Sequence, residues 1–391
     1  MRFFCACILV SVASALPVFA VYAPIPEQEQ GKAWSASLRG GVSYDSNIFG
    51  APSNEIHSWV YSVSPQLKYN QSVTNQLFVS AGYELDMDYF DNRPGTKALF
   101  SHLFNGRAAY AFSPLTTFDL SDTYDISRNP AALLAGVPVN TNQSFKSNQL
   151  DAHLATSPLP KAGVVLKFRS LNYRYDDGFL AGELDRTENL FGLEGNYAVL
   201  PEIKAAAEYR YQQINYDTAG GTKDKTSNFF LGGADYALGK QYTASFRAGF
   251  EDRTRKSQRS TTAPYVELSA KYDYANHSFV SAGYAYSLEE VSDVVTYTDE
   301  KVNQFFVNLQ HALSALVVAS ASLDYEPSVL QGRRGFANAN EDTTRAGLAL
   351  TYLPTKNWAL TASYDHDRVS SDVKSREFTR NRTGVSATYS F

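Results

Sequence analysis

Apolar and polar residues alternate with a period of two along the chain from residue 33 onwards, in runs of about ten residues. In residues 77–89 the odd positions carry apolar or aromatic side chains, from Leu77 to Tyr89, and polar residues such as Ser80 and Glu84 lie between them. The same alternation returns in residues 242–251 and 358–367. Successive side chains of a strand point to opposite faces. Each run therefore predicts a strand with one apolar face and one polar face.

Short turns and long polar connections follow one another along the sequence. The short turns lie near residues 72, 115, 159, 201, 239, 276, 313 and 355. The longer connections fall at residues 91–97, 129–147, 218–224, 254–263, 328–341 and 370–380. This alternation is typical of outer-membrane barrels, in which the turns are periplasmic and the loops external. A closed barrel satisfies every backbone group that crosses the hydrocarbon.

Counting the alternating runs predicts about eighteen strands. Sixteen remains open, because the runs that begin at Asn148 and Lys225 alternate less clearly. The expected starts are Ala33, Ser58, Gln76, Ser101, Thr117, Asn148, Gly163, Arg186, Ile203, Lys225, Gln241, Ala263, Ser278, Val302, Ser314, Asp342, Asn357 and Arg382. The predicted fold is an all-β, antiparallel, up-and-down transmembrane β-barrel over residues 33–391. A barrel of this size encloses water, which makes a conduit the expected function.

The N-terminus has the features of a secretory signal peptide. Arg2 supplies a positive charge, residues 3–16 an apolar segment, and residues 18–20 a small-residue cleavage pattern. We expect cleavage after Ala20, a short periplasmic tail over residues 21–32, and export to the outer membrane of a Gram-negative bacterium. Both cysteines, Cys5 and Cys7, lie within the signal peptide. The mature chain then has no disulfide and no thiolate metal site.

Composition narrows the possible functions. The chain has 391 residues, 14% of them aromatic, and a formal net charge of −5. This charge argues against a nucleic-acid partner, because such proteins concentrate Lys and Arg against phosphate. The six histidines belong to no recognisable catalytic or metal-binding motif. We therefore expect no enzymatic activity and no cofactor.

Charged residues at alternate positions are candidates to line the pore. They are Glu84, Asp86, Asp88, Arg107, Asp119, Asp125, Lys167, Arg169, Arg174, Glu208, Arg210, Arg247, Glu267, Lys271, Asp365 and Asp367. Arg174 joins Lys167 and Arg169 only if a bulge shifts the alternation between them. The two signs come close to balancing, which indicates a weakly selective pore for small polar solutes. The alternative is that the charges form cross-strand ion pairs that stiffen the wall.

The connections carry two further signals. The longest of them, residues 129–147, contains an unusually apolar stretch at residues 130–139. It either folds inward as a constriction or covers a neighbouring surface. Basic residues gather in three other connections, at 253–259, 333–334 and 374–380, where they are expected either to contact outer-membrane lipopolysaccharide or to be solvated. Interfacial aromatic girdles are expected at Trp59, Tyr69, Tyr89, Tyr175, Tyr325 and Trp358.

The end of the chain resembles a known targeting signal. Val385, Ala387, Tyr389 and Phe391 share one face of the last predicted strand. This pattern resembles the C-terminal strand of outer-membrane proteins, which the barrel-assembly machinery reads during biogenesis.

Two stretches resemble the putative β-barrel porin type 2 family of bacterial outer-membrane β-barrel proteins. They are residues 41–49, GVSYDSNIF, and the ending that runs from Ala362 through residues 381–385 to Phe391. The resemblance implies an outer-membrane porin. Some members resemble barrels encoded with exopolysaccharide export systems, so the alternative is an export barrel that works with a periplasmic polysaccharide-export protein. A third possibility is an adhesive barrel whose lumen is blocked.

Overall fold

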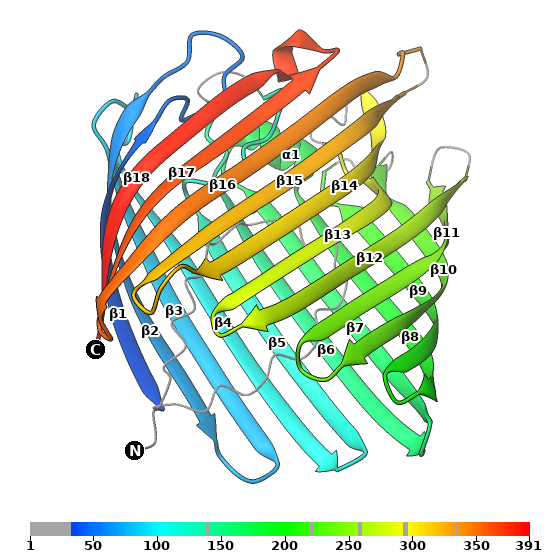
Figure 1. The fold of residues 1–391 in the computed structure, drawn as a ribbon. Helices are drawn as coiled ribbons and strands as arrows, with labels where there is room; N and C mark the ends of the chain where they lie inside the picture. Colours follow the sequence, from blue (N-terminus) through cyan, green and yellow to red (C-terminus); the bar gives the residue numbers. More distant parts are fainter. Residues whose placement is uncertain (1–32, 138–140, 219–222, 257–259, 292–295, 334) are drawn as a thin grey trace.

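A computed structural model describes residues 33–137, 141–218, 223–256, 260–291, 296–333 and 335–391. The expected signal peptide and periplasmic tail, residues 1–20 and 21–32, lie outside the described residues. Within them, eighteen antiparallel strands form one sheet that closes on itself (Figure 1). The structure therefore confirms the barrel and decides for eighteen strands.

The strands follow the chain in order around the barrel. They are β1 (Trp34–Asp45), β2 (Ser58–Ser72), β3 (Leu77–Phe90), β4 (Ala98–Ser113), β5 (Thr116–Ser127), β6 (Phe145–Leu159), β7 (Ala162–Tyr175), β8 (Arg186–Leu200), β9 (Ile203–Tyr216), β10 (Lys225–Leu238), β11 (Tyr242–Arg255), β12 (Thr261–Ala275), β13 (Ser278–Glu289), β14 (Tyr297–Ala312), β15 (Val317–Gly332), β16 (Ala339–Thr355), β17 (Trp358–Ser371) and β18 (Phe378–Ser390). The two less clear runs are the strands β6 and β10. Of the expected starts, Ser58, Arg186, Ile203, Lys225 and Ser278 are the first residues of their strands.

The first and last strands pair to close the barrel. Their register runs from Ser37 opposite Ser390 to Asp45 opposite Arg382. Beyond the strand, the Phe391 N–H donates to the Ala36 carbonyl at 2.9 Å. Closure leaves no unpaired sheet edge among the described strands.

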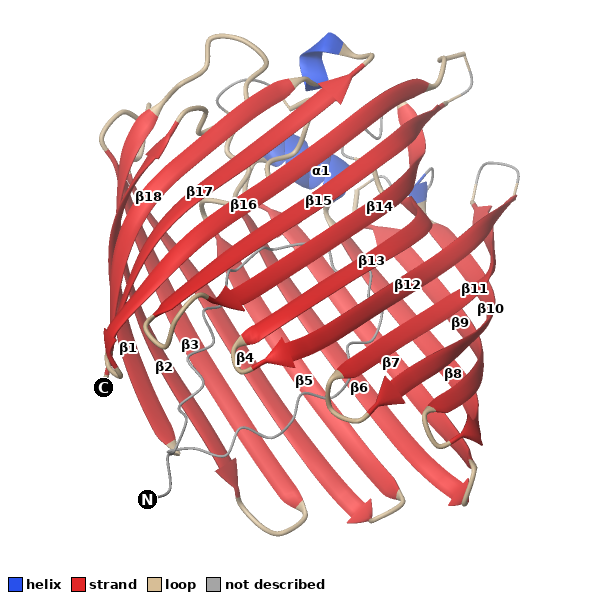
Figure 2. Cartoon of the chain, viewed as in Figure 1, coloured by secondary structure: helices blue, strands red, loops and turns tan. Residues whose placement is uncertain are grey.

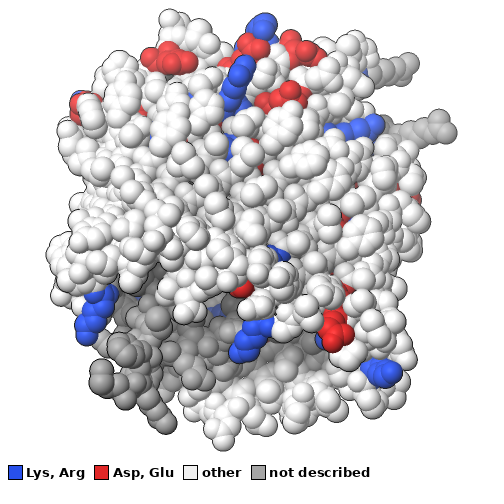
Figure 3. Space-filling view, in the orientation of Figure 1, with Lys and Arg blue, Asp and Glu red and all other residues white. Residues whose placement is uncertain are grey.

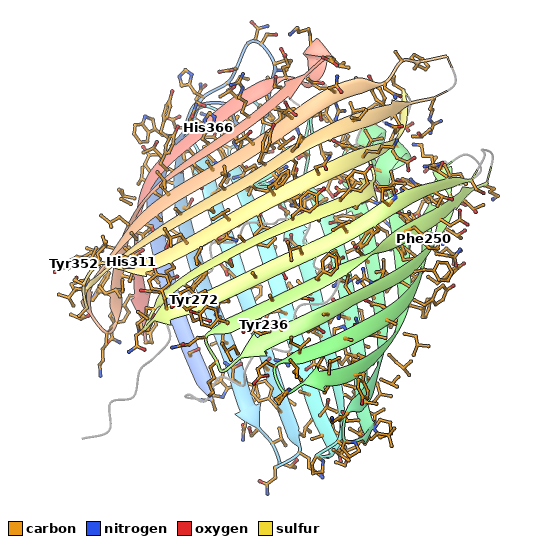
Figure 4. All side chains as sticks on the ribbon, turned by 45° about the vertical axis from the view of Figure 1, so that its right-hand side comes forward. Tyr236, Phe250, Tyr272, His311, Tyr352 and His366 are labelled. Carbon is orange, nitrogen blue, oxygen red and sulfur yellow. The ribbon has the colours of Figure 1, made fainter. Side chains whose placement is uncertain are left out.

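The outer surface of the barrel is apolar, as the alternation predicts. Exposed side chains such as Leu67, Phe104 and Leu348 cover it. Tyr236, Phe250, Tyr272 and Tyr352 project outward from the wall (Figure 4). In the space-filling view of one side, charged groups lie mainly towards the two ends and leave a broad uncharged area between them (Figure 3). No helix in the described part of the chain is long and apolar enough to span a membrane.

Helical structure in the described residues is confined to the end of the barrel that carries the long connections (Figure 2). The short helix α1 (Gly178–Leu184) lies between β7 and β8, and a 3₁₀ turn, η1 (Lys374–Arg376), lies between β17 and β18. The Asp177 carboxylate caps α1 by accepting hydrogen bonds from the N–H groups of Phe179 and Leu180. We call this the extracellular end, because short turns in such barrels face the periplasm.

The largest cluster of buried apolar side chains also lies at the extracellular end. Leu180 and Leu184 of α1 pack with Val291, Tyr297, Leu330 and Ala339, which belong to β14–β16 and the connection before β14. Tyr175 packs against this cluster. Its expected place in the outer girdle is therefore wrong, because the unbroken alternation of β7 turns it inward.

Candidate functional site

The inner wall of the barrel carries the predicted pore-lining charges. Strand alternation and the pairing register place fifteen of the sixteen on the face opposite the exposed apolar side chains. The fifteen are Glu84, Asp86, Asp88, Arg107, Asp119, Asp125, Lys167, Arg169, Glu208, Arg210, Arg247, Glu267, Lys271, Asp365 and Asp367.

Arg174 is the exception. The pairing of β7 with β6 and with β8 contains no shift between Lys167 and Tyr173, and its pairing with β6 continues unshifted to Tyr175. Arg174 therefore shares the outward face of Leu166 and Phe168. Its Nη2 lies 3.0 Å from Asp217 Oδ2 in the connection after β9. Without a bulge, the condition for a pore-lining Arg174 is not met.

A buried ion-pair network joins the inner faces of β7 to β12. Lys167 Nζ lies 2.8 Å from both Glu194 Oε2 and Glu208 Oε1. On β11, Arg247 Nη2 lies 3.1 Å from Glu194 Oε2 and 2.9 Å from Asp235 Oδ2. Sequence reasoning missed Asp235, because the preceding inward residues of β10, Phe229 and Leu231, are apolar and obscure the alternation.

Arg210 extends this network towards β12. Its guanidinium lies 3.0 Å from Glu208 Oε2 and 3.1 Å from Glu267 Oε1. Glu208 and Arg210 are only 4% and 2% exposed. An unpaired charge at this depth would be strongly unfavourable, so the geometry explains why the two signs occur together.

Other predicted residues form separate cross-strand pairs. Arg107 pairs with Asp119, Arg169 with Asp151, and Arg382 with Asp367, at 2.6, 2.6 and 3.1 Å. Lys271 lies 2.9 Å from Asp273 on its own strand. Most inward cations are thus neutralised locally, as the ion-pair interpretation predicts.

Four of the basic residues expected in external connections are instead buried. Arg253 and Arg255 belong to β11 and pair with Asp299 of β14, with Arg253 Nη1 at 2.7 Å from Asp299 Oδ1. Arg376 and Arg380 form buried ion pairs with Glu341 and Asp45. These four guanidiniums therefore have internal partners. Arg259 and Arg334 lie outside the described residues.

Glu290 joins the ion pairs of Arg253, Arg255 and Asp299 to Lys225 of β10, and we call these five residues the extracellular network. It follows the last residue of β13, and its Oε1 lies 2.5 Å from Lys225 Nζ. Burial alone would raise the pKa of Glu290, but Lys225, Arg253 and Arg186 lower this pKa to about 2.

The apolar connection between β5 and β6 folds along the mouth against β17, β18 and the 3₁₀ turn between them. Arg380 Nη1 donates to the Ala131 carbonyl at 3.1 Å, and Arg376 Nη1 donates to the Ala135 carbonyl at 3.2 Å. Ala135 also packs with Val369 and Phe378. We call residues 128–137 and 141–144 the inner loop. It lies at the extracellular mouth and covers the adjoining surface of β17 and β18; that it narrows the lumen stays a prediction.

No group of three or more His, Cys, Asp or Glu side chains in the described residues is arranged to hold a metal ion.

The sequence matches one family over nearly all of the described chain. This is the family described as "Putative beta-barrel porin 2", and the match covers residues 34–391. The chain belongs to this family. With the closed barrel and its apolar outer surface, membership identifies a porin-like outer-membrane protein. No curated protein matches the chain.

Several solved structures of outer-membrane proteins are similar to the chain over most of its length. OccK5 (OpdH) from Pseudomonas aeruginosa is 12% identical, with a TM-score of 0.49, and the match covers 92% of this chain and 98% of that one. A BenF-like porin from Pseudomonas fluorescens Pf-5 is 11% identical, with a TM-score of 0.48 and coverages of 92% and 99%. OccAB3 from Acinetobacter baumannii is 13% identical, with a TM-score of 0.46 and the same coverages. The barrel and the family are established by the strand pairing and the family match, and neither conclusion rests on this likeness.

Proposed function

We propose that the protein is a passive outer-membrane channel for small polar solutes. The observation that carries this proposal is the mixed-charge inner wall, in which most cations are paired with carboxylates. A wall of this kind is wettable and binds no single ion type strongly, so solutes can enter and leave. Small hydroxylated residues, such as Ser320, Thr361 and Ser386, lie on the inner face of the strands outside the ion-pair network.

The extracellular mouth sets the size limit in this proposal. The inner loop and α1 both lie inside the strand ends, and α1 reaches the wall formed by β14–β16. A solute must pass these segments, so small solutes cross more easily than large ones.

The export barrel with a periplasmic polysaccharide-export partner is less well supported. The described periplasmic turns are short, such as the two residues between β4 and β5 and between β8 and β9. Turns of this length offer little surface for a dedicated periplasmic partner.

Planar-bilayer recording of the refolded mature protein tests the proposal. Stable conductance steps, reduced by added oligosaccharides in order of size, are the expected result. Absence of conductance from protein that is verified as folded by circular dichroism and by heat-modifiable migration would overturn it. Conductance that appears only with an added periplasmic export protein would favour the alternative.

A further inference from the structure

Five inward-facing carboxylates in the described strands have no ion-pair partner. One is Asp365 of β17, which lies opposite Arg382 in the register. The other four are Asp88 and Asp125 on β3 and β5, and Glu289 and Glu300 on β13 and β14. In the part of the chain that the structure describes, no Lys or Arg nitrogen lies within 4.0 Å of any of these carboxylates. Asp88 instead accepts hydrogen bonds from Ser62 Oγ and Asn129 Nδ2, at 2.5 and 3.2 Å. Glu289 and Glu300 accept from Ser287 and Ser328.

The arrangement on β13 and β14 is unusual for a sheet. Glu289 and Glu300 are directly opposite each other in the register, and both face inward. Like charges in directly opposed positions destabilise a strand pair. The wall thus keeps two acidic side chains at positions where two uncharged residues, or two residues of opposite charge, would make the strand pair more stable.

The same wall continues into β15 with the same excess of negative charge. Asp324 and Glu326 share one guanidinium, that of Arg345, whose Nη1 lies 3.8 and 3.4 Å from their oxygens. Gln304 Nε2 donates to both carboxylates at 3.0 Å. Asp324 is 5% exposed, and its Oδ1 has no hydrogen-bond donor among the described residues. We call Glu289, Glu300, Asp324 and Glu326 the front acidic wall.

A second acidic wall lies across the barrel. Glu84, Asp86, Asp88 and Asp125 form this back acidic wall. Arg39 lies 3.0 Å from Asp86 and 3.9 Å from Glu84, and Lys68 is the other cation near Glu84. Among the described residues, the back acidic wall therefore has four carboxylates and only two nearby cations, Arg39 and Lys68.

The strand order brings the two walls opposite each other. β4 and β14 are ten strands apart in one direction and eight (18 − 10) in the other. In Figure 1, β13–β15 form the near side of the barrel and β3–β5 the far side. Both walls lie towards the extracellular ends of their strands, and the inner loop contacts the back wall through Asn129 and Asp88. Elsewhere on the inner face, the guanidiniums and Lys167 of the networks described above are paired with carboxylates.

We propose that the front and back acidic walls make the channel selective for small cations and cationic solutes over anions. Carboxylates that surround a narrow pore attract cations and repel anions, and low-dielectric walls concentrate the field between them. This inference rests on the proposed channel function, because it requires that ions pass through the lumen.

Reversal potentials of single channels in a KCl gradient test the inference. The wild-type channel should be several-fold more permeable to K⁺ than to Cl⁻. The ratio should rise when the salt is diluted, since the Debye length grows from about 3 Å at 1 M to about 10 Å at 0.1 M. E289Q/E300Q removes two carboxylates from the front acidic wall and should lower the K⁺/Cl⁻ permeability ratio. D88N/D125N removes two from the back acidic wall and should lower the same ratio. E202Q makes the same chemical change at a half-buried residue of the periplasmic turn between β8 and β9, far from both walls, and should leave the ratio unchanged.

The possible outcomes distinguish loss of selectivity from loss of the channel. The acidic walls are not the selectivity element if the channel conducts without a preference for cations, or if both double variants keep the preference. Either result leaves the proposed passive channel intact. Absence of conductance from folded protein overturns the channel function and the selectivity together. If one double variant fails to fold, the other and the salt dependence still decide, because the two walls belong to different strands.

Discussion

Arg380 of the last strand and Asp45 of the first form a buried, bidentate ion pair. Arg380 Nη2 and Nε lie 2.7 and 3.0 Å from Asp45 Oδ2, and the two residues are 1% and 2% exposed. The pair lies next to the closing register, in which Asp45 is opposite Arg382. Because Arg380 also donates to the Ala131 carbonyl, one guanidinium connects barrel closure with the position of the inner loop.

Removing this guanidinium should destabilise the barrel. Arg380→Met leaves the Asp45 carboxylate buried without its partner, a change that typically costs about 3–5 kcal/mol. Urea unfolding in detergent or lipid measures the loss. Lys256→Met is the matched control, since Lys256 is exposed and lies 3.8 Å from Asp224, and exposed pairs contribute about 1 kcal/mol or less. Equal losses for the two variants would contradict the structural role of the buried pair.

Gly136 should control the position of the inner loop. Its φ is +80°, and a Cβ at this position would lie 2.9 Å from Arg376 Cγ. Gly136→Ala therefore combines backbone strain of about 1 kcal/mol with a clash against the side chain that binds the Ala135 carbonyl. We expect a displaced loop and a larger or noisier single-channel conductance.

Gly95→Ala provides the control for backbone strain. Gly95 has a similar φ of +76°, but a Cβ added to it would meet no atom within 4 Å. This variant should keep the wild-type conductance. If Gly136→Ala also keeps it, the inner loop does not limit the passage of ions.

Glu290 should make the extracellular network sensitive to acid. Its pKa is lowered to about 2 in the folded protein, against about 4.3 in an unfolded chain. The ionised group therefore contributes stability above about pH 4.3, and this contribution is lost as the pH falls towards about 2. Glu290→Gln should reduce stability at neutral pH and flatten the decline in this acidic interval. Unfolding curves at several pH values measure both effects, and an unchanged slope in this interval would contradict the assignment.

Phe391 should affect assembly in cells more than stability. It is 64% exposed and contacts Tyr389 edge-on, with 4.9 Å between ring centroids. Deleting Phe391 should lower the amount of folded barrel in the outer membrane, because the assembly machinery is expected to read Val385, Ala387, Tyr389 and Phe391. The refolded protein should lose little stability. Phe336→Ala, at an exposed aromatic residue in the connection before β16, is the control for expression.

Alternation along single strands was enough to predict the barrel, its strand number to within one hairpin, and the face on which each strand carries its charges. Alternation with a period of two is a local property, and a strand transmits it directly to the inner and outer faces. For this reason, Lys167, Glu208, Arg210 and Arg247 could be assigned to the lumen from their positions alone. Arg174 follows the same rule. An inward orientation would have required a bulge, and because β7 has none, Arg174 faces outward.

The closed sheet decides which charges neutralise one another and which remain in excess. Neither could be predicted from any single strand. Arg210 meets Glu267 across 57 residues of sequence, and Arg380 meets Asp45 across 335. Such partners depend on curvature and on closure of the sheet, which no local pattern encodes. The opposed pair Glu289 and Glu300 likewise depends on the register across a loop. Local alternation therefore set the faces of the wall, whereas the long-range register set the balance of charge on it.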